Sequence, residues 1–152
     1  LASSCYANMF SGCTSLTEAP ALPATTLASY CYNSMFYGCS NLTEAPALPA
    51  TTLAENCYFI MFNCCDKLTK APELPATTLA ERCYWGMFKY CGNLNSITML
   101  ATDISATDCL TDWVIDVAPT GTFTKAAAMT SLPTGINGIP SGWAVQDYSV
   151  TP

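Results

Sequence analysis

The sequence repeats itself every 26 residues, and this period constrains the fold more than any other feature. Cysteine recurs at one position of each copy: Cys5, Cys31, Cys57, Cys83 and Cys109. A fixed period of roughly 20 to 50 residues is typical of solenoids, in which each copy stacks on the next. We therefore predict one elongated array over residues 1–125, with copies starting at positions 1, 27, 53, 79 and 105, followed by a C-terminal capping segment over residues 126–152.

The first part of each copy has an apolar pattern that predicts a helix. In the second copy, Leu27, Cys31 and Met35 recur at every fourth position, which would place them on one helix face. The third copy begins after Thr52, and a glutamate follows three residues later, as in a capping box. We expect the helix of the second copy to end before Gly38.

The second part of each copy predicts a short strand. Residues 42–45 form an extended run, and Pro46 cannot donate a backbone N–H, so a parallel strand there should be only about three or four residues long. Neighbouring strands lie about 4.8 Å apart, whereas packed helices need roughly 8 to 10 Å. The array should therefore curve. The predicted fold class is α/β: a right-handed leucine-rich-repeat solenoid with short parallel strands on the concave side and helices on the convex side.

The ten cysteines leave two interpretations open. Equivalent cysteines on neighbouring helices would be about 8 to 10 Å apart, beyond the ~4.4 to 6.8 Å between the Cα atoms of a disulfide. Bridges between copies are therefore not expected. Within a copy, cysteines eight residues apart could form a bridge, or they could be buried free thiols. The fifth copy keeps Cys109 but has Val117 in place of the second cysteine.

Composition argues against several classes of function. The net charge is −6, and the five Lys and Arg residues are too few to favour nucleic acid or an anionic membrane surface. No run of about 18 apolar residues predicts a membrane span. The chain contains no His, which removes the commonest general base and the commonest nucleophile partner. We expect no enzyme activity, no cofactor and no metal site. Asp108, Asp112 and Asp116 should form a solvated helix face.

Positions that vary between copies are expected to face outward, because the recurring positions must build the core. Exposed aromatic side chains at stacked positions are typical of recognition surfaces. On the concave side, threonines recur in a polar ladder. The predicted partner-binding residues are Tyr37, Phe59, Trp85, Tyr90, Thr17, Thr43 and Thr69. An alternative is that the aromatic side chains pack on neighbouring helices.

The repeat also resembles a known family. The unit MFxGCxxLTxAPxLPATTLAxxCY, at residues 35–58, resembles the BspA-like leucine-rich repeats of bacterial surface proteins. The ending, at residues 113–123 and 138–143, is similar to the closing segment that often follows such repeats. This resemblance implies a secreted or cell-surface bacterial protein that takes part in adhesion and binds a host or microbial protein or glycan.

The sequence leaves two functions open. The preferred one is a non-enzymatic surface module for binding a protein or glycan, and the alternative is a rigid spacer that presents another domain. The chain opens within a repeat at Leu1, so we expect upstream copies in the parent protein. Without those upstream copies, the apolar face of the first copy would be uncovered, which predicts end-to-end self-association of this chain.

Overall fold

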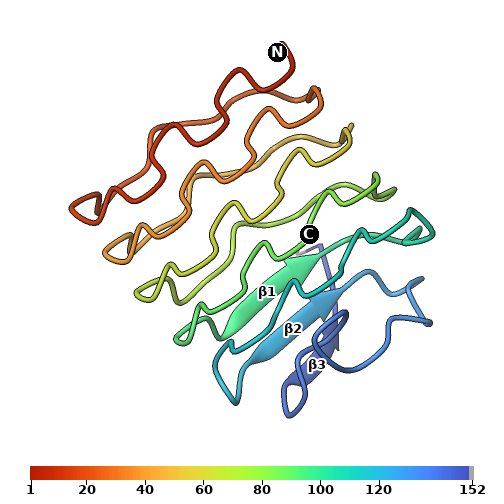
Figure 1. The fold of residues 1–152 in the computed structure, drawn as a ribbon. Coiled ribbons are helices and arrows are strands. Elements are labelled where there is room, and N and C mark those ends of the chain that lie inside the picture. The colour runs from red at the N-terminus through yellow and green to blue at the C-terminus, as the bar shows by residue number, and fades with distance from the viewer. Residues whose placement is uncertain (151–152) are drawn as a thin grey trace.

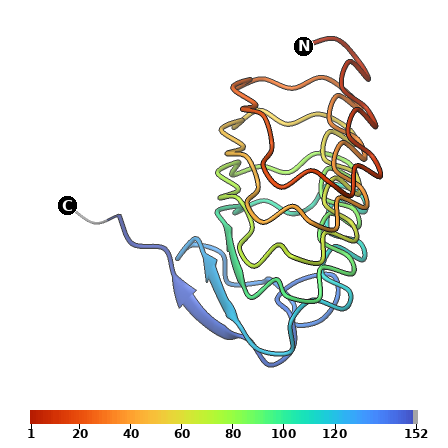
Figure 2. The ribbon, with the colours of Figure 1, turned by 90° about the vertical axis from the view of Figure 1, so that its left-hand side faces the viewer.

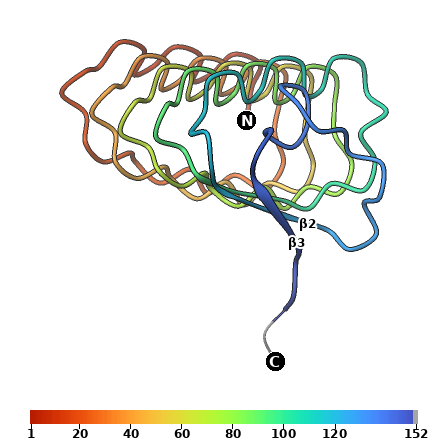
Figure 3. The same ribbon diagram turned by 90° about the horizontal axis from the view of Figure 1, so that it is seen from below.

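The repeats stack in register in the computed structural model, which describes residues 1–150 (Figures 1 and 2). The first copy lies at one end, and the segment after residue 118 covers the other. Each copy is a flattened coil with a wavy row of turns on one side and an extended run on the other (Figure 3). The last two residues of the predicted cap, 151 and 152, lie outside the described residues.

The wavy side is not helical, so the predicted α/β leucine-rich-repeat solenoid is wrong. Residues 1–150 contain no α-helix. The predicted helices are replaced by rows of consecutive turns, which we term turn rows. They are residues 3–12, 29–38, 55–64, 81–90 and 107–116. In an α-helix every N–H bonds to the carbonyl four residues earlier. In a turn row, every second N–H bonds only three residues back, as Cys31 does to the Ala28 carbonyl at 3.2 Å.

The remaining N–H groups of each turn row donate to the next copy. Tyr32 donates to the Cys57 carbonyl at 3.1 Å, and Phe36 donates to the Met61 carbonyl at 3.0 Å. Five such bonds join each of the first four rows to the row that follows. Chains linked in this way lie about 4.8 Å apart, the same spacing as neighbouring strands. The two sides of the array therefore have no mismatch in spacing, and the argument for a curved array does not apply.

Every fourth residue of a turn row has a positive φ angle. In the second copy these are Tyr30, Ser34 and Gly38, with φ of 58°, 54° and 70°. The equivalent residues in the other four copies share this conformation. In the fifth copy they are Asp108, Asp112 and Asp116, which we expected on a helix face. This four-residue period explains the apolar pattern, because Cys31 and Met35 each open a four-residue segment and point into the core.

The extended side forms a small parallel sheet at the C-terminal end. It contains β1 (Ser96–Met99), β2 (Thr122–Lys125) and β3 (Ala144–Asp147), in the order β1-β2-β3. The first three copies form only isolated bridges on this side, such as that between Glu18 and Glu44. Prolines explain the difference, since the first three copies carry Pro20, Pro46 and Pro72 where the fourth has Thr98.

The core lies between the turn rows and the extended side. It is built from columns of identical residues, each repeated at intervals of 26. The rings of Phe36, Phe62 and Phe88 are stacked with centroids 5.6 and 5.8 Å apart and planes within 7°. Leu42, Leu68 and Leu94 form a second fully buried column. Neighbouring copies thus supply each other with the apolar cover that a single copy lacks.

The C-terminal segment closes the last turn row. Trp113 replaces the methionine of earlier copies and is fully buried, and its indole N–H donates to the Gly138 carbonyl at 2.8 Å. The backbone N–H of Asp112 donates to the Asn137 side chain at 2.7 Å. Trp143 donates to the Ala118 carbonyl at 2.7 Å. These bonds cover part of the last turn row, where an interior row would contact the next copy.

Candidate functional site

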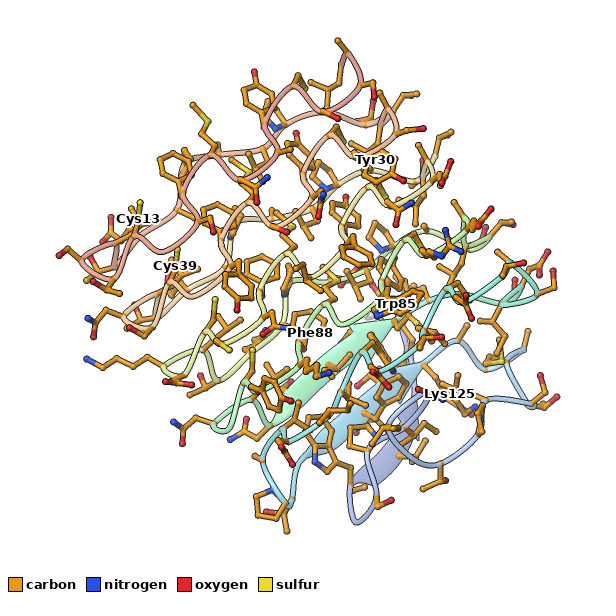
Figure 4. All side chains as sticks on the ribbon, viewed as in Figure 1. Cys13, Tyr30, Cys39, Trp85, Phe88 and Lys125 are labelled. Atoms are coloured by element: carbon orange, nitrogen blue, oxygen red, sulfur yellow. The ribbon has the colours of Figure 1, made fainter. Side chains whose placement is uncertain are left out.

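The four predicted aromatic residues lie on the turn-row side of the array. Phe59 and Trp85 are neighbours, with ring centroids 5.6 Å apart and planes at 51°, and both are half-buried. Trp85 lies near the middle of the array in Figure 4. Tyr37 and Tyr90 are 41% and 44% exposed. Among the described residues, no ring contact joins either tyrosine to the Phe59–Trp85 pair, so the structure unites two of the four.

Two cations flank these rings, and our sequence reasoning did not select them. The Arg82 guanidinium lies 5.8 Å from the centre of the Trp85 ring, and the Lys89 Nζ lies 5.2 Å from the centre of the Tyr90 ring. Arg82 also pairs with Asp108 at 3.7 Å. The sequence feature that could have identified Arg82 and Lys89 is their place at outward-facing positions of the fourth copy. We term these residues the aromatic–cation surface; it comprises the Phe59–Trp85–Arg82 group and the Tyr90–Lys89 pair.

The fold does not require aromatic side chains at this surface. The position of Phe59 and Trp85 is held by Ala7 in the first copy, Asn33 in the second and Thr111 in the fifth. The inter-copy hydrogen bonds persist whichever residue is present. For example, the carbonyls of both Asn33 and Trp85 accept bonds from the preceding copy, at 2.9 and 2.8 Å. The two large rings therefore add contact surface without being needed for stacking.

The predicted threonines lie on the extended side, and all three are exposed. Thr43 and Thr69 line a groove of about 560 Å³ between residues 43–47 and 69–73, whereas Thr17 lies outside it. The Thr43 N–H donates to the Thr17 carbonyl at 3.3 Å. Within residues 1–150, no backbone hydrogen bond joins the two walls of the groove. The groove thus opens where the ladder of the extended side is interrupted.

The buried cysteine side chains are unsuited to nucleophilic chemistry at neutral pH. All ten cysteines are free thiols, and those of the second to fourth copies are buried except Cys64, which is half-buried. Burial raises the pKa of the Cys83 and Cys91 thiols to about 12 and holds the pKa of Cys57 well above the ordinary value. The Cys91 thiol donates to the Phe62 carbonyl at 3.0 Å. Because the thiolate is the reactive form, these protonated thiols act as core residues.

The cysteines of neighbouring copies are stacked, as Cys13 and Cys39 show at one edge of the array (Figure 4). Our expectation of an 8 to 10 Å separation assumed packed helices, so it does not apply to this fold. Residues 1–150 contain no group of three or more His, Cys, Asp or Glu side chains arranged to hold a metal ion. The same range contains no helix long and apolar enough to cross a lipid bilayer.

Comparison with known proteins gives no match. No family model matches the chain, and neither a curated protein nor a solved structure is significantly similar to it. The resemblance to BspA-like surface proteins therefore stays a prediction from the repeat sequence.

Proposed function

We propose that this protein is a non-enzymatic binding module that recognises a protein or glycan partner through the aromatic–cation surface. The observation that carries the proposal is the substitution of Phe59 and Trp85 into a column where the same backbone also accepts Ala7 and Asn33. A location on the surface of a bacterium, or outside it, is proposed on the repeat resemblance alone.

The chemistry of this surface suits recognition. Trp, Tyr and Arg are the residues enriched among binding hot spots, and all three occur here within the fourth copy. Half-buried rings hold a fixed orientation, so binding orders few additional side chains. Arg82 and Lys89 add hydrogen-bond donors beside the apolar rings. The surface therefore combines apolar area with directional polar groups.

The test uses substitutions that the chain itself provides. Trp85→Ala and Phe59→Asn install the residues that the first and second copies carry at this position. After a screen of defined glycans and proteins has identified a ligand, each variant should weaken its binding by about 2 kcal/mol, or roughly 30-fold. Asn33→Ala, at the same position of the second copy, is the matched control and should bind like the parent.

Unfolding of each variant by urea, followed by circular dichroism, separates lost contacts from lost structure. The proposal requires weaker binding with a nearly unchanged free energy of unfolding. Equal binding by the parent and both variants would remove the aromatic–cation surface from the function.

The competing function is a rigid spacer that presents another domain. The unbroken stack of phenylalanine rings from Phe10 to Phe88 favours it, because neighbouring copies in such a column cannot bend independently. A spacer would tolerate Trp85→Ala and Phe59→Asn without any effect on the activity of the domain that it carries.

A further inference from the structure

The recurring cysteines form two columns, and the thiols of one column are directed at the neighbouring copy. We term the column of Cys5, Cys31, Cys57, Cys83 and Cys109 the first cysteine column, and that of Cys13, Cys39, Cys65 and Cys91 the second cysteine column. In the second column, the Cys65 thiol donates to the Phe36 carbonyl of the preceding copy at 3.2 Å. The Cys91 thiol donates to the Phe62 carbonyl in the same way, at 3.0 Å. Each of these thiols therefore points along the column.

The hydrogen bonds of the second column place each sulfur beside the preceding cysteine. The Phe62 carbonyl accepts both the Cys91 thiol at 3.0 Å and the backbone N–H of Cys65 at 3.1 Å. The Phe36 carbonyl joins Cys65 and Cys39 in the same way, at 3.2 and 3.1 Å. Because one oxygen binds both groups, the sulfur of one copy lies next to the cysteine backbone of the copy before it.

The spacing of the copies suits a disulfide between them. Chains joined by backbone hydrogen bonds lie about 4.8 Å apart, within the ~4.4 to 6.8 Å between the Cα atoms of a disulfide. A bridge within one copy lacks this geometry. In the fourth copy, for example, the buried side chain of Met87 lies between Cys83 and Cys91 in the sequence of core positions.

We propose that the second cysteine column is an inter-copy disulfide site, in which Cys65 bonds to Cys91 when the chain folds in the presence of a small-molecule disulfide. This pairing leaves Cys13 and Cys39 to pair with each other, whereas a bridge between Cys39 and Cys65 would leave two members of the column single. The bridge ties the third copy to the fourth. It does not rest on the proposed function, so either can fail alone.

Thiol–disulfide exchange with oxidised glutathione forms this bridge. One cysteine thiolate attacks a sulfur of oxidised glutathione and releases a glutathione thiolate, which leaves a mixed disulfide. The thiolate of the other cysteine then attacks the protein sulfur of the mixed disulfide and releases the second glutathione. The cysteine pair is oxidised, and the glutathione disulfide is reduced to two thiols. Because Cys65 and Cys91 are both buried in the folded array, the exchange takes place while the chain folds.

The experiment refolds the full chain from urea in a mixture of reduced and oxidised glutathione. Iodoacetamide then blocks the remaining thiols, and mass spectrometry without reductant identifies the linked peptides. Peptides that join Cys65 to Cys91 should exceed those that join Cys83 to Cys91 by at least about tenfold. The circular dichroism spectrum of the bridged protein should match that of the reduced protein.

Two variants of the fourth copy separate a bridge between copies from a bridge within a copy. Cys91→Ala removes one partner and should abolish the proposed bridge. Cys83→Ala is the matched control, because it removes a buried cysteine of the same copy that belongs to the first column. The Cys65–Cys91 bridge should persist in this control, whereas a bridge between Cys83 and Cys91 would be lost in both variants.

The parent chain decides the proposal even where a variant does not fold. A refolded parent chain without the Cys65–Cys91 bridge would overturn it. So would a bridge that forms only in chains whose circular dichroism spectrum differs from that of the reduced protein.

Discussion

Replacement of Gly86 by alanine tests the turn-row architecture directly. Gly86 lies in the middle of the fourth turn row with φ of 56°. A Cβ atom there would lie 2.8 Å from Cγ2 of Ile60 in the preceding copy. In a helix the same change would stabilise the protein by roughly 0.5 to 1 kcal/mol, because glycine is a poor helix former. The two architectures therefore predict effects of opposite sign.

The size of the effect follows from two contributions. A left-handed conformation costs an L-residue about 1 to 2 kcal/mol relative to glycine. The close approach to Ile60 adds roughly 1 kcal/mol, since the side chain must move within a packed layer. We expect Gly86→Ala to lower the free energy of unfolding by about 2 to 3 kcal/mol.

Urea unfolding followed by circular dichroism measures this change. Gly92→Ala is the matched control, because Gly92 is exposed, its φ is not positive and no atom lies within 4 Å of the added Cβ. It should alter stability by less than about 0.5 kcal/mol. A Gly86→Ala variant as stable as the parent, or more stable, would refute the turn-row reasoning.

Three further outcomes follow from the core. The protein should lose stability as pH rises from 9.0 towards about 12, because unfolded thiols ionise near 9.0 while burial keeps the pKa of Cys83 and Cys91 at about 12. Denaturant midpoints across this pH range measure the loss of stability, and a midpoint that does not change with pH would contradict the prediction. In the native state at pH 8, iodoacetamide should modify the exposed Cys5 and Cys13 well before Cys57 or Cys83, as peptide mapping would show; equal rates would mean that the middle copies are open. Trp113→Phe should lower the free energy of unfolding by about 1 to 3 kcal/mol, because the Gly138 carbonyl loses its buried hydrogen-bond donor. No change in the urea midpoint would show that the indole hydrogen bond is dispensable.

The stacking of the copies could be predicted from the sequence, but the conformation of each copy could not. The 26-residue period places Leu42, Leu68 and Leu94 in one column, and the structure buries all three. The helix prediction failed because an apolar residue at every fourth position satisfies both a helix and a row of turns. A helix has 3.6 residues per turn, so a strict four-residue spacing drifts by about 40° at each step. The continuation of that spacing from Leu27 to Cys39 was the available warning.

A second warning lay in the residue types at the left-handed positions. Asn, Asp and Gly tolerate positive φ better than other residues. The first copy has Asn8 and Gly12 at such positions, and the fifth copy has three aspartates there. We interpreted those aspartates as one helix face because their spacing of four residues suited a helix. Their restriction to aspartate instead reflects the backbone conformation that they adopt.

The candidate site was only partly predictable. The spacing of 26 between Phe59 and Trp85 predicts neighbours in any stacked array, and their rings are in contact. The groove beside Thr43 and Thr69 depends on where backbone bonding on the extended side is interrupted, and no residue pattern indicated that place. Arg82 was missed because we judged the outward columns by aromatic content alone.

The uniform direction of the inter-copy hydrogen bonds has an electrostatic consequence. Each peptide group carries a dipole of about 3.5 D, and alignment of such groups gives a helix its partial charges at either end. Here five peptide groups of each of the first four copies point their N–H along the axis of the array and their carbonyls towards Leu1. The array is therefore an electric dipole with its negative pole at Leu1. Asp108, Asp112 and Asp116 lie in the last turn row, at the positive pole, where their charges are favoured.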